Sequence, residues 1–345
     1  MRRALTTLTI AVLASLTFAA CGDDTSDPGP SGADAPAAGT DAFPVTVEHA
    51  FGETTIESKP ERIATVAWAN HEVPLALGVV PVGMSKATWG DDDGDGVLPW
   101  VEEKLEELDA DTPTLFDETD GIAFEAVAAT QPDLILATYS GLTESEYETL
   151  SKIAPVVAYP DIAWATTVQD MITISSTAMG MADEGEQLVA DLDAQVQAAY
   201  ADHPELDGQS IMFSYIDPTD LSQVGFYTTH DTRPGFLADM GMTMPAVVTE
   251  ASAGTEEFYV TRSAEDLDAF DDVDIFVTYG DPEGELVDKI TSDPVLSQIP
   301  AIGRGSIAVL EDSTPLAASA NPSPLSIGWG IEDYFDLLAS AVSPS

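Results

Sequence analysis

The feature that most constrains the fold of this chain is a repeated alternation of short apolar runs with helix-like stretches. Strand-like runs lie at 62–66, 79–84, 134–137, 156–158, 210–215, 223–227, 275–278 and 306–310. Helix-like stretches in the second half lie at 234–240, 264–270, 284–291 and 331–341. Two shorter alternating runs, 45–49 and 54–57, flank Phe51-Gly52-Glu53 and predict a hairpin. Because strands that alternate with helices form parallel sheets covered by helices, the sequence predicts an α/β fold.

Two similar halves joined by one helix are the simplest arrangement of these segments. The stretch 164–182 has no Pro or Gly before Gly180 and places apolar side chains on one face. A helix of that length spans about 28 Å. We therefore expect two Rossmann-like lobes with parallel sheets, an N-terminal lobe at 44–163 and a C-terminal lobe at 183–345, joined by a single long linker helix at 164–182.

The N-terminus has the features of an export signal. Arg2 and Arg3 precede an apolar run that ends at Cys21, the one cysteine of the chain. Residues 1–20 therefore predict a signal peptide, and a cysteine directly after the cut is typical of a lipoprotein whose thiol is acylated. An ordinary signal peptide followed by a stray cysteine is the alternative. Residues 21–43 are rich in Gly, Pro, Ser, Asp and Ala, which predicts a flexible tether. We expect an extracytoplasmic protein, anchored by lipid to the outer face of the cytoplasmic membrane.

The charge balance limits the possible partners. The chain has 61 Asp and Glu against 11 Lys and Arg, a formal net charge of −50. Such a chain repels nucleic acids and anionic lipid headgroups, so we expect no nucleic-acid partner. A single cysteine allows no internal disulfide, and stability must come from the core, for which 44% hydrophobic residues are available.

Several sequence strings resemble one family of transport receptors. They are Lys59-Pro60-Glu61-Arg62-Ile63, the run from Leu75 to Gly83, Phe124-Glu125-Ala126-Val127, Gln131 to Leu136, Leu150 to Val157, Phe236 to Gly241, and Glu265-Asp266-Leu267. Together they make the chain similar to substrate-binding proteins built on one rigid linker helix, which serve importers of iron-siderophores, heme and cobalamin. The strings are most similar to those of iron-siderophore binders.

The resemblance implies a function and partners. A monomeric receptor of this family holds a ferric siderophore between its lobes, hands it to an ABC permease dimer and requires no cofactor. In the family, one acid per lobe docks onto arginines of the permease, and Glu125 and Glu265 occupy matching places in the two halves. The alternative is that these acids merely favour the first turn of a helix through its dipole.

Candidate ligand-binding residues follow the strands, because ligands of open α/β sheets bind beyond the carboxyl ends of the strands. They are Trp68, Asn70, Trp89, Tyr139, Trp164, Tyr215, Tyr227, Arg233 and Arg262. Aromatic faces suit the organic shell of a ferric siderophore, and an arginine fork matches catecholate or carboxylate oxygens. Arg233 is the preferred arginine, since few arginines follow the signal peptide. The alternatives are that the aromatic residues pack within a lobe and that Arg233 pairs with Asp231.

One acidic loop has the spacing of a calcium site. Asp91, Asp93 and Asp95 occupy positions 1, 3 and 5 of a twelve-residue run, with Gly96 at position 6 and Glu102 at position 12. Oxygen ligands at these steps can surround Ca²⁺, and the glycine allows the sharp turn. A solvated acidic loop is the alternative, because a chain this acidic produces such strings by chance.

Other functions have less support in the sequence. The four histidines, His49, His71, His203 and His230, lack the paired spacing of a zinc or manganese site. A heme or cobalamin receptor of the same family remains an alternative, with His71 or Tyr139 as the axial ligand of heme. So does an extracellular sensor or adhesion module stabilised by calcium. The sequence has no nucleophile elbow and no phosphate loop, so we do not expect an enzyme.

Overall fold

The computed structural model describes residues 43–281 and 285–342. The predicted signal peptide, the predicted lipidation site Cys21 and the predicted tether up to residue 42 lie outside the described residues. Among the helices that are described, none combines the length and the apolar character needed to cross a lipid bilayer.

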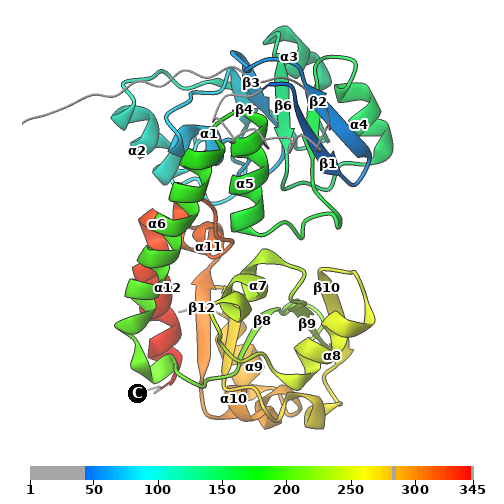
Figure 1. Ribbon diagram of the computed structural model, residues 1–345. Helices are drawn as coiled ribbons and strands as arrows, with labels where there is room; N and C mark the ends of the chain where they lie inside the picture. Colours follow the sequence, from blue (N-terminus) through cyan, green and yellow to red (C-terminus); the bar gives the residue numbers. More distant parts are fainter. Residues whose placement is uncertain (1–42, 282–284, 343–345) are drawn as a thin grey trace, which may run out of the picture. The chain divides into compact units, whose positions relative to one another are not determined.

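The order of strands and helices follows the predicted alternation (Figure 1). The strands are β1 (Val45–His49), β2 (Gly52–Ile56), β3 (Ile63–Thr65), β4 (Gly83–Ser85), β5 (Thr114–Phe116), β6 (Leu134–Ala137), β7 (Val156–Ala158), β8 (Ile211–Tyr215), β9 (Gln223–Tyr227), β10 (Tyr259–Ser263), β11 (Ile275–Gly280) and β12 (Ile307–Glu311). The α-helices are α1 (Glu72–Ala76), α2 (Pro99–Glu107), α3 (Phe124–Ala129), α4 (Glu144–Leu150), α5 (Val168–Ala178), α6 (Ala182–Ala201), α7 (Thr232–Asp239), α8 (Ala246–Gly254), α9 (Glu285–Ser292), α10 (Pro300–Gly303), α11 (Pro315–Ser319) and α12 (Ser326–Val342). Three short 3-10 helices are η1 (Pro204–Leu206), η2 (Leu267–Phe270) and η3 (Leu296–Gln298).

Two five-stranded sheets form the framework, and the predicted α/β class is confirmed. The first sheet has the order β5-β4-β3-β6-β7, and all its strands are parallel. The second sheet has the order β10-β9-β8-β11-β12. There β11 pairs in parallel with both β8 and β12, whereas β9 pairs antiparallel with both β8 and β10. The expectation of parallel strands throughout is therefore wrong for β9 of the second sheet. We call the first sheet with β1, β2 and α1–α4 the first lobe, and the second sheet with α7–α11 the second lobe.

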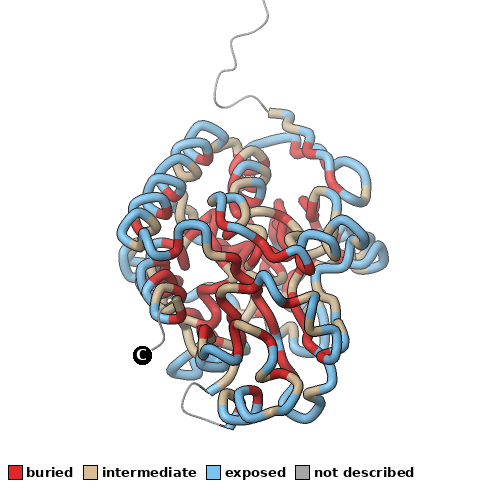
Figure 2. Tube along the Cα trace, turned by 90° about the horizontal axis from the view of Figure 1, so that it is seen from below, coloured by how far each residue is buried: buried red, intermediate tan, exposed pale blue. Residues whose placement is uncertain are grey.

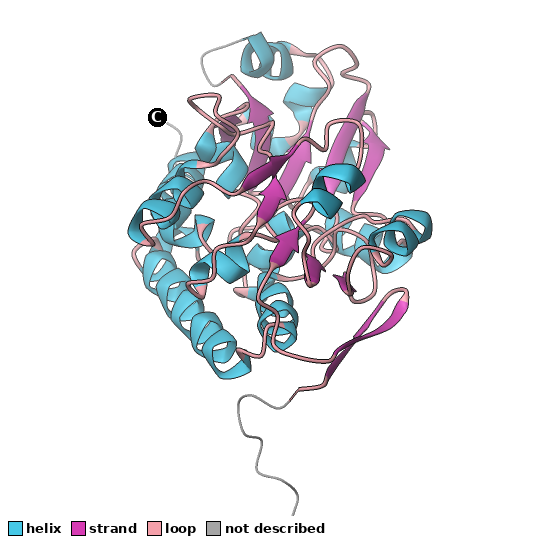
Figure 3. Cartoon of the chain, turned by 90° about the horizontal axis from the view of Figure 1, so that it is seen from above, coloured by secondary structure: helices cyan, strands magenta, loops and turns pink. Residues whose placement is uncertain are grey.

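The central strands are buried on both faces, which explains their unbroken apolar sequence. In β6, Leu134 and Leu136 pack with the hairpin β1-β2 and the end of α5, whereas Ile135 packs on the other face with residues of α3 and α4. This alternation is what the pleat of a strand imposes. Figure 2 shows the buried residues gathered along the interior segments, and Figure 3 shows the hairpin near the start of the described chain.

The connection between the lobes differs from the prediction. The predicted bounds of the linker helix, 164–182, are wrong: α5 covers only Val168–Ala178, and the long helix that connects the lobes is α6, which covers Ala182–Ala201. Thr167 caps the start of α5 through Asp170 N at 3.0 Å. Gly180 has a φ of +70°, a left-handed conformation that ends a helix and that glycine adopts readily. The longer helix α6 follows, packs against α5 and α12, and runs from the first lobe to the second (Figure 1).

The start of α12 is fixed to the first lobe by a buried carboxylate. Glu72, at the start of α1, is fully buried. Its Oε2 accepts a hydrogen bond from Leu325 N at 2.9 Å, and its Oε1 accepts one from Trp100 Nε1 at 2.8 Å. Trp100 also contacts Trp329 of α12, with ring centroids 5.3 Å apart. Burial raises the pKa of Glu72, although these donors oppose the shift. The C-terminal helix is thus held by both lobes.

Candidate ligand-binding site

The first half of the site is built on the loops that follow β3 and β6. Asn70 is fully buried between these loops. Its Nδ2 donates to Val66 O and Tyr139 O, each at 2.8 Å, and its Oδ1 accepts from Tyr139 N at 2.9 Å and Thr138 Oγ1 at 3.0 Å. One side chain therefore satisfies backbone groups of two neighbouring strand ends and fixes the residues that follow them.

Two tryptophans project from these strand ends on unusual backbone. Trp68 lies between Ala67 and Ala69, which have φ angles of +62° and +61°, and Trp164 itself has a φ of +62°. Left-handed conformations of residues other than glycine carry strain and concentrate at functional sites. The Trp164 indole packs so closely on Gly141 that a Cβ there would lie 2.2 Å from Nε1. The positions of both indoles are therefore set by their backbone.

The second half of the site is an arginine held in an aromatic and acidic setting. Arg233, in the first turn of α7, donates from Nε and Nη2 to the two oxygens of Asp231, both at 2.7 Å. Its guanidinium lies 3.8 Å from the centroid of the Tyr227 ring and donates from Nη1 to Tyr279 Oη at 3.3 Å. Burial alone would lower the pKa of Arg233, but the hydrogen bonds and charge of Asp231 raise it well above its usual value. Burial raises the pKa of Tyr279 to about 12. The arginine is charged, oriented and already paired.

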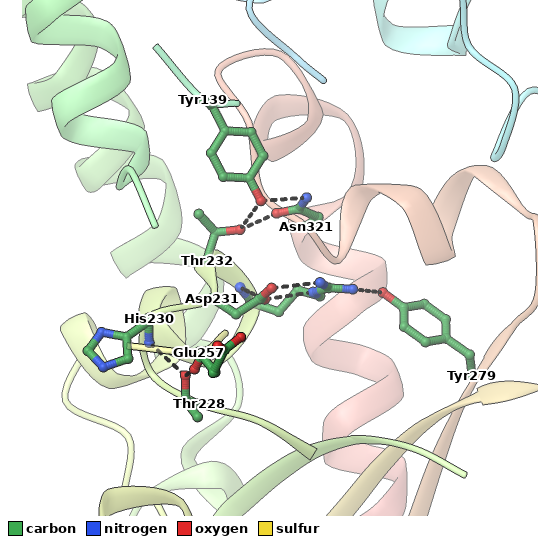
Figure 4. A network of polar contacts seen from close by, with 9 residues as sticks. Tyr139, Thr228, His230, Asp231, Thr232, Glu257, Tyr279 and Asn321 are labelled. Atoms are coloured by element: carbon green, nitrogen blue, oxygen red, sulfur yellow. Dashed lines mark hydrogen bonds and ion pairs between the residues drawn. The ribbon is translucent and has the colours of Figure 1, made fainter. Parts of the chain in front are cut away.

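Polar contacts join the two halves (Figure 4). The hydroxyl of Tyr139 lies 3.2 Å from Thr232 Oγ1 and accepts from Asn321 Nδ2, also at 3.2 Å. Thr232 Oγ1 in turn donates to Asn321 Oδ1. The network links the end of β6 in the first lobe to the start of α7 and to the segment after α11. Burial raises the pKa of Tyr139, so its hydroxyl keeps its proton in the physiological range.

Two adjoining hollows lie beside this network. The smaller, of about 190 Å³, has walls from both lobes, and we call it the aromatic hollow: it is lined by Trp68, Tyr139, Trp164, Asp231, Arg233, Phe258 and Asn321. The larger, of about 370 Å³, lies at the strand ends of the first lobe, and we call it the acidic hollow: its lining includes Trp68, Thr88, Glu118, Ile122, Ser140, Glu146 and Trp164. Because both contain Trp68 and Trp164, the two indoles are a shared wall of one continuous site.

The structure brings together four of the nine predicted ligand-binding residues. Those that line the aromatic hollow are Trp68, Tyr139, Trp164 and Arg233. Asn70 and Tyr227 support them, since Asn70 is buried beneath the loops and Tyr227 lies against Arg233. Their roles toward a ligand stay predictions.

The other three lie outside both hollows. Trp89 packs edge-on against Tyr279 and donates from Nε1 to Asp312 Oδ1 at 3.3 Å. Tyr215 is 43% exposed at the end of β8. Arg262 forms an exposed ion pair with Asp266 at 3.2 Å. Strand-end reasoning missed Phe258, Glu118 and Glu146. Phe258 precedes an edge strand, and the two acids belong to a chain in which acids are too common to carry a signal.

The roles of the acids expected to dock onto a permease and of the calcium-like loop stay predictions. Glu125 is exposed in α3 and Glu265 is exposed after β10. Asp91, Asp93 and Asp95 each place a carboxylate oxygen within 4.8 Å of the others. The negative charges of Asp95 and Asp93 contribute, after burial, to raising the pKa of Glu102, which places that carboxylate near the cluster. Hydrogen bonds from backbone N–H groups within the loop, such as Gly96 N to Asp91 Oδ2 at 2.7 Å, orient these carboxylates.

Comparison with known proteins places the chain in a family. A family model described as periplasmic binding protein matches residues 63–314. The probable siderophore-binding lipoprotein YfiY of Bacillus subtilis is 31% identical over 154 residues, which are 44% of this chain and only 43% of that protein. The Fe(3+) dicitrate-binding periplasmic protein FecB of Escherichia coli is 24% identical over 280 residues, 79% of this chain and 84% of that protein.

A solved structure gives the same result. The crystal structure of PiaA from Streptococcus pneumoniae TIGR4, in complex with ferrichrome, is 44% identical and superposes with a TM-score of 0.82. The match covers 86% of this chain and 98% of that one. Because the family model spans residues 63–314, well over half of the chain, the chain belongs to the periplasmic binding protein family.

Proposed function

We propose that this protein is an extracytoplasmic, lipid-anchored receptor that binds a ferric siderophore and delivers it to an ABC permease. The observation that carries the proposal is the site itself: aromatic side chains from both lobes and one oriented arginine converge on adjoining hollows. Aromatic walls with a few fixed polar groups suit a bulky organic chelate. The names of YfiY, FecB and PiaA, each of which states a siderophore or a ferric chelate, support the same assignment.

Two features favour a siderophore over heme. Tyr139, one candidate axial ligand, has its hydroxyl engaged by Thr232 and Asn321. His71, the other, is buried and borders a pocket of about 20 Å³, far too small for a porphyrin. His71 lines neither hollow, and Tyr139, which lines the aromatic hollow, would have to give up these hydrogen bonds to coordinate an iron.

Ligand binding is testable by titration. The purified protein is titrated with ferric hydroxamate, catecholate and citrate chelates, and with heme and cobalamin, while tryptophan emission and heats of binding are followed. We expect at least one ferric chelate to bind with a Kd in the submicromolar range and to quench Trp68 and Trp164. The Trp164→Phe variant should lose much of the quenching, whereas Trp329→Phe, outside both hollows, should not. Submicromolar binding of heme or cobalamin alone would overturn the assignment.

Delivery to a permease is a separate part of the proposal. Glu125 and Glu265 are exposed, one on each lobe, as docking onto a two-fold partner requires. Reversing both charges, Glu125→Arg with Glu265→Arg, should leave the Kd for the chelate unchanged and abolish iron uptake by cells that rely on this receptor. Glu144→Arg on α4, an exposed acid away from both positions, is the control. Normal uptake by the double variant would contradict the docking role.

A further inference from the structure

The residues that line the site carry more negative than positive charge. Among the described residues that line the two hollows, Arg233 is the one cation, and its guanidinium forms a bidentate pair with the carboxylate of Asp231. Asp231 is 1% exposed in its side chain and Arg233 16%, so the pair is internal to the protein. Glu118 and Glu146 line the acidic hollow with no cation beside them in its lining. The nearby Lys86 borders a different small pocket, where its chain lies on Gly96.

Glu118 has an oxygen without a partner. Its Oε2 accepts hydrogen bonds from Ala67 N at 2.9 Å and Ser85 Oγ at 3.0 Å, which anchor the carboxylate at the ends of β3 and β4. Its Oε1 is buried and has no hydrogen-bond donor among the described residues. A buried acceptor left without a donor is unfavourable, and such an atom at a binding site is satisfied when a ligand supplies the donor.

Glu146 adds a second carboxylate of fixed position. Its Oε2 accepts from Thr143 N at 2.8 Å and Thr143 Oγ1 at 2.7 Å in the capping box of α4. Burial raises the pKa of Glu118, the hydrogen bonds from Ala67 and Ser85 oppose that shift, and the charge of Glu146 adds a smaller contribution in the raising direction, so the two carboxylates of the hollow repel each other. A ligand that brings positive charge or N–H donors relieves this repulsion, and an anionic ligand increases it.

We propose that the site selects ferric chelates of zero or positive net charge that carry an ammonium or N–H donor, with Glu118 and Glu146 as the residues that determine this specificity. The inference rests on the proposed function and narrows its substrate class. Three hydroxamate groups cancel the charge of Fe³⁺, whereas catecholate and citrate chelates retain negative charge. Under this proposal Arg233 helps to shape the site and does not attract an anionic chelate, because Asp231 already neutralises its charge.

The test compares chelates that differ in one charge. Ferrioxamine B is a linear trihydroxamate with a terminal ammonium, and its N-acetylated form is neutral with the same iron centre. Ferric dicitrate serves as the anionic chelate. Dissociation constants are measured by calorimetry for the wild-type protein, Glu118→Gln, Glu146→Gln and the control Glu144→Gln, which removes an exposed acid on the same helix as Glu146. Circular dichroism and Tm establish that each variant is folded.

The expected order of affinity is ammonium chelate, then acetylated chelate, then ferric dicitrate. A charge-assisted hydrogen bond accounts for a difference of about tenfold between the first two. Glu118→Gln or Glu146→Gln should reduce that difference and improve the binding of ferric dicitrate, whereas Glu144→Gln should change neither. Tighter binding of ferric dicitrate, or a preference that both variants leave intact, would overturn the specificity inference alone. If no ferric chelate binds at all, the proposed function fails with it.

Discussion

Replacing Asn70 tests whether the site depends on the junction between the ends of β3 and β6. Asn70→Ala leaves Val66 O, Tyr139 O and Tyr139 N buried without the side chain that satisfies them. At about 1–3 kcal/mol for each unsatisfied group, and with partial relaxation, we expect the free energy of unfolding to fall by about 4 kcal/mol. For a folded body of this size that corresponds to a fall in Tm of about 6 °C.

A second variant separates the loss of hydrogen bonds from the loss of volume. Asn70→Asp keeps the shape but turns the donor Nδ2, which lies 2.8 Å from two carbonyl oxygens, into a third oxygen. At neutral pH it should destabilise at least as much as the alanine variant. The exposed Gln197→Glu makes the same chemical change on α6 and should alter stability by less than about 0.5 kcal/mol.

The assay combines urea denaturation, which gives the free energy of unfolding, with titration of a ferric chelate. Because Asn70 fixes the loop that carries Trp68 and the backbone of Tyr139, folded Asn70→Ala protein should bind the chelate about tenfold more weakly. A loss of stability below about 1 kcal/mol would refute the argument from buried polar groups. Unchanged chelate affinity in a clearly destabilised variant would refute the positioning role.

Three further predictions follow from other residues. Burial lowers the pKa of His71 from 6.5 to about 4 in the folded protein, so between these two pH values the unfolded chain binds a proton that the folded protein does not. The contribution of His71 to the free energy of unfolding is therefore fully present above pH 6.5 and is lost as the pH falls toward 4, by about 3 kcal/mol. The His71→Gln variant should lack this loss of stability when the free energy of unfolding is measured by urea denaturation above pH 6.5 and near pH 4. A pH dependence equal to that of the wild type would contradict the prediction. Arg233→Lys loses the bidentate bond to Asp231 and the contact with Tyr227, so chelate affinity should fall about tenfold, whereas Arg262→Lys, in an exposed pair, should change it little; equal effects would argue against a special role for Arg233. If the Asp91–Glu102 loop binds calcium, the Tm of the wild type should be higher in calcium than in EGTA, and the Tm of Asp91→Asn should be the same in both. Identical melting curves of the wild type in calcium and in EGTA would indicate a solvated loop that binds no calcium.

Much of the framework could be predicted because central strands are marked by local sequence. β6 and β7 begin and end at the predicted residues, since each is a short apolar run buried on both faces. The break between α5 and α6 could not be predicted in the same way. It depends on the left-handed Gly180 and on the close approach of the helices at Gly185, where a Cβ would lie 2.0 Å from Ser176 Oγ. Strand direction at β9 depends on pairing partners, which local sequence does not specify.

The site was predictable to the extent that strand ends define it. Trp68, Tyr139 and Trp164 follow strands of the first sheet and line the hollows as expected from that rule. Their backbone strain and the buried support from Asn70 are tertiary features that no pattern indicates. The charge of the site was only partly predictable. The pairing of Arg233 with Asp231, two residues before it, is the alternative that the sequence left open, and the structure shows it. Which of the many acids line the hollows depends on tertiary packing, which local sequence does not specify.

The double attachment of the C-terminal helix limits how far the two lobes can move relative to each other. The lobes are connected once by α6 and a second time where Glu72 and Trp100 contact the beginning of α12. Two bridges side by side resist bending far more than one, and separating them requires exposing a desolvated carboxylate. We therefore expect the angle between the lobes to differ little between the empty and the loaded receptor. Under the proposed function, a permease would then distinguish them by the surface that a bound chelate completes at the mouth of the site, rather than by a change in the shape of the receptor.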